Sequence, residues 1–332
     1  MNNLKERVTI YEVAKASGVS LATVSRVINN SSTVKEDTKK KVMAVINKLG
    51  YKPSGLAQSL ATNKTTNIGV IIPSANYVYI SNMLSGVTEV CKVNGFSVNL
   101  YTTSHSREDA TFCLERVIKS RVDGVIVFDD ELSTEDFELF ASYSVPVIAI
   151  NNTIVESKIG SIAFGYEHLF KRIVSDYFTK GDKKMTFLHV HNAGKLLRRI
   201  ENNFIKSHLE NDREYEIMNC DDSYQRTYHD FLDIFKEKRK MYVVAYRDSI
   251  AAAVSNAAID CGLSVPDDVE VLSIIGTKYS QILRPQISSM YIDMQEVGRR
   301  SVYMLMDLIA GNLSNKEYKF ESTYVKRDST RF

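Results

Sequence analysis

Short apolar segments alternate with amphipathic segments of helical period from Asn67 to the end of the sequence. The segments predicted as strands are Ile68–Ile72, Ser97–Tyr101, Gly124–Phe128, Val147–Ile150, Met185–Val190, Met241–Ala245 and Val269–Ile274. Alternation of this kind favours parallel, doubly wound sheets, because a helix supplies the crossover that each pair of parallel strands needs. The number of strands predicts two such sheets. We therefore expect two α/β lobes, with any ligand at the carboxyl ends of the strands in a cleft between them.

Formal charge divides the chain near residue 64 into two unlike parts. Residues 1–64 hold 11 Lys or Arg and 4 Asp or Glu, a net charge of +7, whereas the remainder holds 31 basic and 36 acidic residues, a net charge of −5. This asymmetry favours a basic module that binds a polyanion, fused to an acidic domain with another role. A solvated basic face would give the same charge. The residue pattern within residues 1–64 has to distinguish these two interpretations.

The overall composition excludes a membrane protein and a small disulfide scaffold. Apolar residues make up 44% and charged residues 25% of the 332 residues, as in ordinary globular proteins. No apolar run approaches the roughly 20 residues of a membrane span. The first residues do not resemble a secretory signal, and the 4 cysteines follow no metal-binding or disulfide pattern. We expect a cytoplasmic protein with about two domains.

Two short, capped helices are predicted near the N-terminus. Residues Thr9–Glu12 have the capping-box pattern, in which a Thr hydroxyl accepts the amide of the third residue and a Glu reaches back. Gly18 supplies a left-handed turn residue after the first helix, and a second helix follows Ser20 over residues 21–29. This arrangement is a helix-turn-helix, whose second helix presents its N-terminal residues to the DNA major groove. The residues expected to face outward are Leu21, Ala22, Ser25 and Arg26.

A third helix, expected over residues 35–49, closes the core of the basic part. Its inward positions at helical spacing are Val42, Val45, Ile46 and Leu49. Its outer face carries Lys39–Lys41. Such a run is commonly just solvated, but beside a recognition helix it could contact DNA phosphates.

These segments resemble the DNA-binding domain of the lac repressor (LacI/GalR) family. The matching residues are Val8–Ala14, Gly18–Ser20, Ala22–Asn29 and Leu49–Pro53. The resemblance implies a dimeric repressor, with each recognition helix in a major groove of a palindromic operator. Leu21 and Ala22 occupy the two positions that set base preference in the family and are similar to the Met-Ala pair of its catabolite-control branch. Arg26 would read guanine O6 and N7.

The resemblance also implies which residues contact DNA and where the DNA-binding domain ends. That domain covers residues 1–52, and residues 53–66 form a hinge helix and linker, which in the family folds on operator binding. Leu60 matches the family's minor-groove wedge, and Gly55 departs from its pattern in a way that raises the cost of ordering the helix. The implied contacts are Thr9, Ile10, Ser20, Leu21, Ala22, Thr23, Ser25, Arg26, Asn29, Tyr51, Ala57 and Leu60.

The pattern of residues 53–66 agrees with a marginal helix. Pro53 fixes the backbone at a helix start, and the segment is too short to be a stable helix alone. Leu56 and Leu60 are four residues apart, which favours an amphipathic helix over a plain linker.

The resemblance continues through residues 67–332. The residues that carry it are Asn67–Pro73, Val122–Gly124, Gly262–Val269 and Arg327–Arg331. It implies a periplasmic-binding-protein-like core for effector binding and dimerisation, in which the chain passes between two lobes three times. The implied N-terminal lobe comprises residues 67–163 and 291–322, and the implied C-terminal lobe comprises residues 164–289 and 323–332.

Several residues that hold sugars in the family are replaced in this chain. The family's Asn-Pro-Phe-Phe, Val-Asp-Asn, Asn-Asp and Gly-Phe-Asp-Asp appear as Asn76–Tyr79, Phe164–Tyr166, Arg247–Asp248 and Ser273–Gly276, and its cleft Arg falls one residue out of register, near Arg199. Each lost hydrogen bond would leave a sugar hydroxyl unpaired at a cost of about 1–3 kcal/mol. The cleft residues implied are Asn76, Tyr77, Tyr79, Tyr166, Arg199, Arg247, Asp248 and Ile275.

Three hypotheses for control follow: a less polar or anionic effector held by Arg247, Arg199 and the tyrosines, a protein corepressor, or no effector. Relatives in the catabolite-control branch use a serine-phosphorylated phosphocarrier protein bound at the N-terminal lobe. Arg299 and Arg300 on a late helix could pair with its phosphate, although a solvated helix face is the simpler interpretation.

Enzymes and solute receptors fit the sequence less well. The chain contains no GxGxxG, P-loop or GxSxG motif. Asp129–Glu131 is an acidic loop without an identifiable partner, and His189 and His191 share a strand face without a third ligand, so we expect no metal and no cofactor. A solute receptor without gene regulation would need export, which the helix-turn-helix contradicts. The sequence predicts a non-enzymatic, homodimeric repressor of carbohydrate or catabolite genes, located with the nucleoid.

Overall fold

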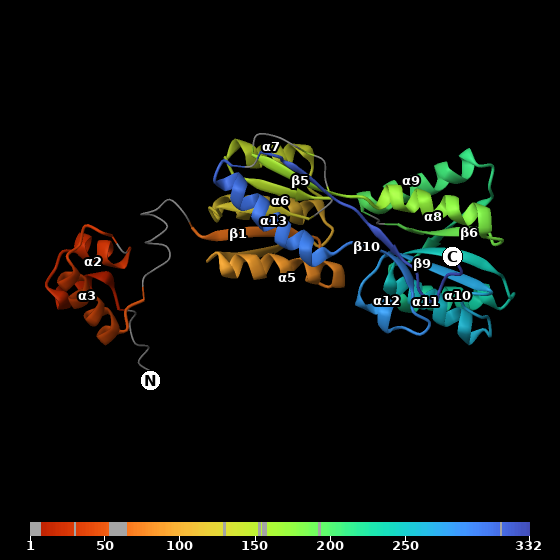
Figure 1. The fold of residues 1–332 in the computed structure, drawn as a ribbon, viewed down its shortest axis with the longest axis horizontal. Helices are drawn as coiled ribbons and strands as arrows, with labels where there is room; N and C mark the ends of the chain where they lie inside the picture. The colour runs from red at the N-terminus through yellow and green to blue at the C-terminus, as the bar shows by residue number, and fades with distance from the viewer. Residues whose placement is uncertain are drawn as a thin grey trace. The chain divides into compact units, whose positions relative to one another are not determined.

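A computed structural model of the protein describes residues 8–29, 31–52, 65–128, 131–151, 154, 158–191, 194–312 and 314–332, without the side chains of residues 195 and 196. The chain divides into two units, Met1–Thr66 and Asn67–Phe332. The first unit is helical and the second is α/β (Figure 1). The predicted fold class is therefore confirmed.

The first unit is a bundle of three helices, α1 (Ile10–Ser17), α2 (Leu21–Ile28) and α3 (Glu36–Leu49). Their inward faces share one core, whose buried members are Val13, Ala14, Val24, Val27, Val42 and Ile46. Periodicity alone located this core, because each helix buries a single apolar stripe.

The helix ends follow the predicted capping chemistry with small differences. The Thr9 capping box is present, and Gly18 ends α1 in the left-handed conformation at φ 65°. Helix α2 ends at Ile28, one residue before the predicted end, with Asn29 as its C-cap. Helix α3 begins one residue later than predicted, because Lys35 is its N-cap.

The second unit contains two six-stranded sheets. The first lobe has the strand order β11-β5-β4-β3-β1-β2, and the second has the order β12-β10-β9-β8-β6-β7. The strands of the first sheet are β1 (Asn67–Ile72), β2 (Ser97–Thr102), β3 (Gly124–Val127), β4 (Val147–Ile150), β5 (Ile159–Phe164) and β11 (Glu317–Phe320). Those of the second are β6 (Met185–Val190), β7 (Tyr215–Cys220), β8 (Met241–Arg247), β9 (Val269–Ile275), β10 (Ser288–Tyr291) and β12 (Thr323–Val325). All pairs are parallel except β10 with β12, which forms an antiparallel edge.

Helices cover both faces of each sheet (Figure 1). The first sheet packs α5 (Val78–Val93) and α13 (Met294–Ile309) on one face and α6 (Arg107–Lys119) and α7 (Thr134–Ser142) on the other. The second packs α8 (Tyr166–Lys180) and α9 (Lys195–Glu210) opposite α10 (Tyr224–Phe235), α11 (Asp248–Asp260) and the short α12 (Lys278–Ile282). Along β8, Tyr242 and Val244 enter one core and Val243 the other. This alternation is the period of two that places every strand between two helical layers.

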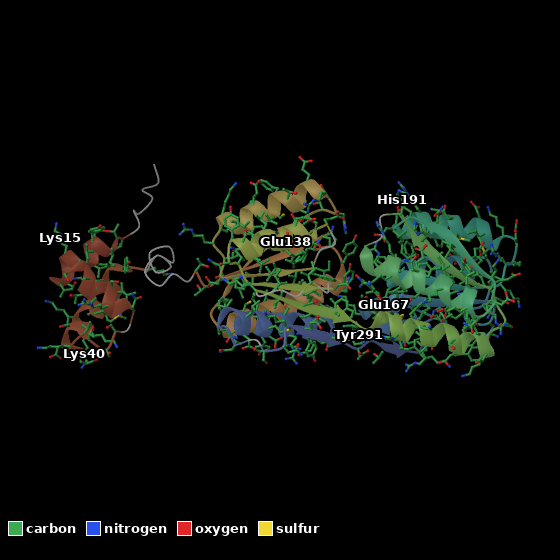
Figure 2. All side chains as sticks on the ribbon, turned by 90° about the horizontal axis from the view of Figure 1, so that it is seen from above. Lys15, Lys40, Glu138, Glu167, His191 and Tyr291 are labelled. Carbon is green, nitrogen blue, oxygen red and sulfur yellow. The ribbon has the colours of Figure 1, made fainter. Side chains whose placement is uncertain are left out.

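The chain passes between the lobes three times. It does so between β5 and α8, between β10 and α13, and between β11 and β12. Tyr291, labelled in Figure 2, lies at the end of β10 on the second passage. Both lobes are therefore built from segments that are far apart in the sequence.

Helices α5 and α13 approach each other unusually closely in the first lobe. A Cβ atom on Gly86 would lie 2.0 Å from the carbonyl oxygen of Gln295, and one on Gly298 would lie 2.0 Å from that of Met83. The two backbones are in direct contact at both glycines, and no larger residue fits without separating the helices.

All seven predicted strands are confirmed, and five further strands, β5, β7, β10, β11 and β12, were missed. Strands β10, β11 and β12 have only three or four residues each, too few for a recognisable period. In β5, Gly160 and Ser161 interrupt the apolar run, and tertiary pairing with β4 and β11 supplies the strand instead.

His208 on α9 gives the second lobe an acid-sensitive core. It is fully buried among aromatic rings, and its Nδ1–H donates to the Phe204 carbonyl at 2.7 Å. Nε2 has no hydrogen-bond partner among the described residues. Burial lowers the pKa of His208, because a charged imidazole would be poorly solvated there.

We expect the stability of this lobe to fall as the pH drops through about 6.5, the unfolded pKa of histidine. The folded state binds fewer protons than the unfolded state, so this contribution is complete above that pH and is lost below it. Urea unfolding of wild type and His208→Phe, about one pH unit above and below 6.5, checks this. The wild type should lose more free energy of unfolding than the variant, and equal losses would contradict the role of His208.

Candidate functional site

Helix α2 and its C-cap offer an exposed surface for nucleic acid. Leu21, Ala22, Arg26 and Asn29 are exposed, and Arg26 makes no ion pair with any described residue. Lys15 and Lys40 project from the surface of the same unit (Figure 2). An unpaired guanidinium on an exposed helix is free to bind the edge of a base, and the lysines are free to bind phosphates.

The remaining predicted DNA contacts in this unit also have structural partners. Ser20 caps α2, since its hydroxyl accepts the Thr23 amide at 3.2 Å and lies 2.9 Å from the Thr23 hydroxyl. The Thr9 amide donates to Glu12 at 2.7 Å, which lowers the pKa of that carboxyl. Ser25 is half-buried, and Ile10 and Tyr51 are half-buried against the helical core. These residues fix the start and the tilt of the helices, while their outer atoms stay accessible.

The predicted hinge contacts Ala57 and Leu60, with Pro53 and Gly55, lie outside the described residues. The same holds for Asp129 and Asp130 of the acidic loop.

Between the lobes, five side chains form what we call the interlobe cluster: Tyr77, Tyr79, Asp222, Tyr246 and Arg247. The Arg247 guanidinium lies over the Tyr77 ring, 4.8 Å from its centroid, so a cation–π contact joins the second lobe to the first. Arg247 Nη2 also donates to the Asp222 carbonyl at 2.8 Å and forms an ion pair with the Asp222 carboxylate. The Tyr77 hydroxyl lies 3.3 Å from His105 Nε2, and burial together with the Asp222 charge raises the pKa of Tyr77.

Two further tyrosines belong to the cluster. Tyr79 of the first lobe stacks on Tyr77 at 5.6 Å between ring centroids, and Tyr246 of the second lobe adds to the effect of burial on the pKa of Tyr79. Burial raises the pKa of Tyr79 well above its ordinary value and that of Tyr246 to about 12. Both phenols therefore stay neutral and act only as hydrogen-bonding groups.

Asp248 is turned into the second lobe. Its Oδ2 accepts from the Thr277 amide at 2.6 Å, the Thr277 hydroxyl at 2.7 Å and the Ser280 amide at 3.2 Å. Burial raises its pKa despite these bonds. Asp248 thus holds the segment after β9, a structural role that the sequence did not reveal.

Arg199 is engaged by both lobes. Its Nε donates to Glu167 Oε1 at 2.7 Å, and its Nη2 donates to Asn151 Oδ1, beyond β4 of the first lobe, at 3.0 Å. Glu167 is labelled in Figure 2, at the start of α8. The guanidinium is therefore part of a second bridge between the lobes.

The other predicted cleft residues do not join the cluster as hydrogen-bonding groups. Asn76 is exposed, and Tyr166 is buried against Phe164. Ile275 is a buried core residue. Ser273, Ile274 and Ile275, which stand where the family has part of its Gly-Phe-Asp-Asp motif, belong to the fully buried strand β9.

A cavity of about 560 Å³ opens at the carboxyl ends of β6 and β7. It is lined by His189, Val190, His191, Asn219, Cys220, Asp221 and Asp222. The imidazole of His189 contacts Glu201 at 2.8 Å, and Asp221 accepts from Arg226 at 2.8 Å. Among the described residues, no group of three or more His, Cys, Asp or Glu side chains could hold a metal ion.

Arg299 and Arg300 on α13 differ in their surroundings. Arg299 is bound by Glu89 and Glu296, each at 3.0 Å, and the hydrogen bonds to these carboxylates raise its pKa. Arg300 lies over the Tyr318 ring at 4.3 Å. A phosphate at Arg299 would have to compete with two carboxylates.

Sequence reasoning missed Asp222 and Tyr246. Asp222 follows β7, which was not predicted. Tyr246 lies near the end of β8, beyond the point where the predicted strand stopped. The carboxyl ends of the correct strands would have indicated both residues.

Comparisons with known proteins agree with both units. Residues 9–54 match the family described as bacterial regulatory proteins, lacI family, and residues 185–330 match a periplasmic binding protein-like domain. The catabolite control protein A of Priestia megaterium is 29% identical over 304 residues, which cover 90% of this chain and 91% of that protein. The chain is therefore similar to lacI-family regulators in both of its units.

Solved structures of lacI-family regulators have the same fold. The lac repressor dimer bound to operator and an anti-inducer is 24% identical, with a TM-score of 0.84 over 98% of this chain and 99% of that chain. The transcription regulator CcpA of Lactococcus lactis is 19% identical, with a TM-score of 0.68 over 80% of this chain and 99% of that chain. The lacI-family match of residues 9–54 and the likeness to catabolite control protein A identify the chain as a DNA-binding transcription regulator. Among the described residues, no helix is both long and apolar enough to cross a lipid bilayer.

Proposed function

We propose that the protein is a homodimeric repressor that binds a palindromic operator through α2 and through the hinge of residues 53–66. The observation that carries this proposal is the exposed, unpaired Arg26 on a helix whose start is fixed by the Ser20 cap. One recognition helix reads only a half-site, so two copies are needed for a full operator. The dimeric, operator-bound state of the lac repressor supports the same assembly.

The DNA contacts that we propose are of two kinds: some residues recognise bases, and others position the recognition helix. Arg26 reads guanine, while Leu21 and Ala22 select bases by methyl contact and exclusion because they carry no hydrogen-bonding side-chain groups. The capping and core residues position α2, and Leu60 acts as a wedge in the minor groove. We place the protein in the cytoplasm, together with the chromosomal DNA.

Replacement of Arg26 by alanine should remove operator selectivity while leaving weak binding to unrelated DNA. Loss of a bidentate guanine contact costs about 1–3 kcal/mol for each half-site, whereas phosphate contacts supply the binding that does not depend on sequence. The operator is first selected from a random DNA pool with the wild-type protein. Fluorescence anisotropy with operator and scrambled DNA, at one salt concentration, then gives the selectivity of each variant.

Lys48→Ala is the matched control, because it removes one exposed positive charge from the same unit near the end of α3. It should weaken binding to both DNAs alike. An unchanged ratio of operator to scrambled affinity in Arg26→Ala would contradict the reading role of Arg26.

For control of the repressor, the interlobe contacts favour a ligand other than a sugar, or none. Asp248, which matches the Asp of the family's Asn-Asp pair, and Arg199, which falls near its cleft Arg, are bound within the protein. Control by a phosphorylated protein corepressor is the alternative. We propose Arg300 as its contact rather than Arg299, because Arg299 already has two carboxylate partners.

A further inference from the structure

We infer that the interlobe cluster is a latch that holds the two lobes closed without an effector and thereby keeps the protein in its operator-binding form. This inference rests on the proposed function for its effect on DNA, but the latch itself is a property of the α/β unit. Its central contact is the Arg247 guanidinium on the Tyr77 ring, which belong to different lobes.

The contact between the lobes at this place is a stack of three groups. Arg247 of the second lobe lies over the Tyr77 ring of the first lobe, and Tyr77 stacks on Tyr79 at 5.6 Å between ring centroids. Asp222 in turn holds Arg247 through both its carboxylate and its backbone carbonyl. Asp222 thus holds the guanidinium over the Tyr77 ring, and opening the lobes would separate this cation from the ring.

The polar groups around the cluster are also committed to the protein. Arg199 joins Glu167 to Asn151 of the opposite lobe, and Asp248 is bound by Thr277 and Ser280. A sugar would have to replace these bonds, because each hydroxyl needs a partner of its own. Arg199 therefore binds the other lobe, and Asp248 binds its own lobe.

Buried polar contacts of this kind can hold one of two arrangements. Coupling between a lobe arrangement and a distant site typically changes affinity by roughly 5- to 150-fold. Breaking the latch should therefore open the lobes and weaken operator binding within that range.

The test compares wild type, Arg247→Met, Tyr77→Leu and the double variant as full chains. Methionine keeps most of the arginine volume but removes the charge. Arg226→Met is the control, because Arg226 is exposed and is paired with Asp221 inside the second lobe alone. Small-angle X-ray scattering gives the radius of gyration, fluorescence anisotropy gives affinity for the selected operator and for scrambled DNA, and thermal unfolding checks that each variant is folded.

We expect both single variants to have a larger radius of gyration and a roughly 5- to 150-fold weaker affinity for the operator alone. The double variant should lose no more than the worse single variant, because both changes break one contact. Arg226→Met should match wild type. Addition of glucose or lactose to wild type should change neither measurement.

An unchanged radius of gyration in both folded single variants would overturn the latch. Expansion with unchanged or tighter operator binding would overturn its regulatory role. If the wild type selected no operator, the proposed function would fail, while the scattering measurement would still decide whether the lobes are latched.

Discussion

Replacement of Glu270 by glutamine lowers the free energy of unfolding of the α/β unit by about 3–5 kcal/mol, the usual cost of removing one partner of a buried ion pair. Glu270 is fully buried on β9, and the side chain of its partner Lys183 is only 4% exposed. Lys183 Nζ donates to Glu270 Oε1 at 2.9 Å. Arg331 donates to the same carboxylate through its amide at 2.8 Å and its Nε at 3.0 Å.

A glutamine keeps the shape of this side chain but removes its charge and turns an amide N–H₂ toward donors. The Lys183 ammonium then stays buried without a counter-ion, and one of the bonds to Arg331 is lost. The same site joins β9 to the segment before β6 and to the end of the described chain, so its loss weakens three segments of the second lobe together.

Urea unfolding followed by circular dichroism measures this effect. Glu214→Gln is the control, because it makes the same chemical change in a surface pair with Lys184 at 4.0 Å, where Glu214 is 91% exposed. Exposed pairs contribute about 0–1 kcal/mol. A loss for Glu270→Gln as small as that for the control would show that the pair is solvated in solution.

Replacement of Gly298 by alanine should destabilise the first lobe by about 3 kcal/mol, the upper part of the range for overpacking. The added Cβ would lie 2.0 Å from the Met83 carbonyl oxygen and 2.9 Å from the Val87 amide nitrogen. Both atoms belong to the backbone of α5, so no side-chain rotation can relieve the clash. In an isolated helix alanine is more favourable than glycine, so the expected loss of stability comes from packing alone.

Thermal and urea unfolding of Gly298→Ala and Gly86→Ala test both sides of the same contact. Ser85→Ala on α5 is the control, because Ser85 is exposed and its side chain bonds only within its own helix. We expect the control to be neutral or slightly stabilised. Wild-type stability in both glycine variants would mean that α5 and α13 lie farther apart than described.

The sequence predicted the helix ends of the first unit to within about one residue, because capping residues close in the sequence determine them. The Thr9 capping box, Gly18 and Ser20 each act through backbone groups only a few residues away. In the α/β unit, the central strands were predicted from apolar runs, but β11 and β12 exist because neighbouring strands offer unpaired hydrogen-bonding groups. The local sequence pattern therefore does not predict these edge strands.

The interlobe site was only partly predictable for the same reason. Tyr77, Tyr79 and Arg247 stood out because they replace residues of the family's cleft motifs, which drew attention to the correct region. Their pairing could not be predicted from spacing, since Arg247 and Tyr77 are far apart in the sequence and meet only when both sheets are complete. Asp248 was misassigned because its bonds to Thr277 and Ser280 turn it away from the other lobe.

The three passages of the chain between the lobes make each lobe a physical body but not a contiguous segment of the gene. A protease cut between β5 and α8 would leave α13 and β11 of the second fragment packed in the lobe formed by the first fragment. The nicked protein would therefore stay associated without a covalent link. By the same topology, recombination between relatives could exchange the helical unit as one block, whereas exchange of a lobe would need two insertions made together.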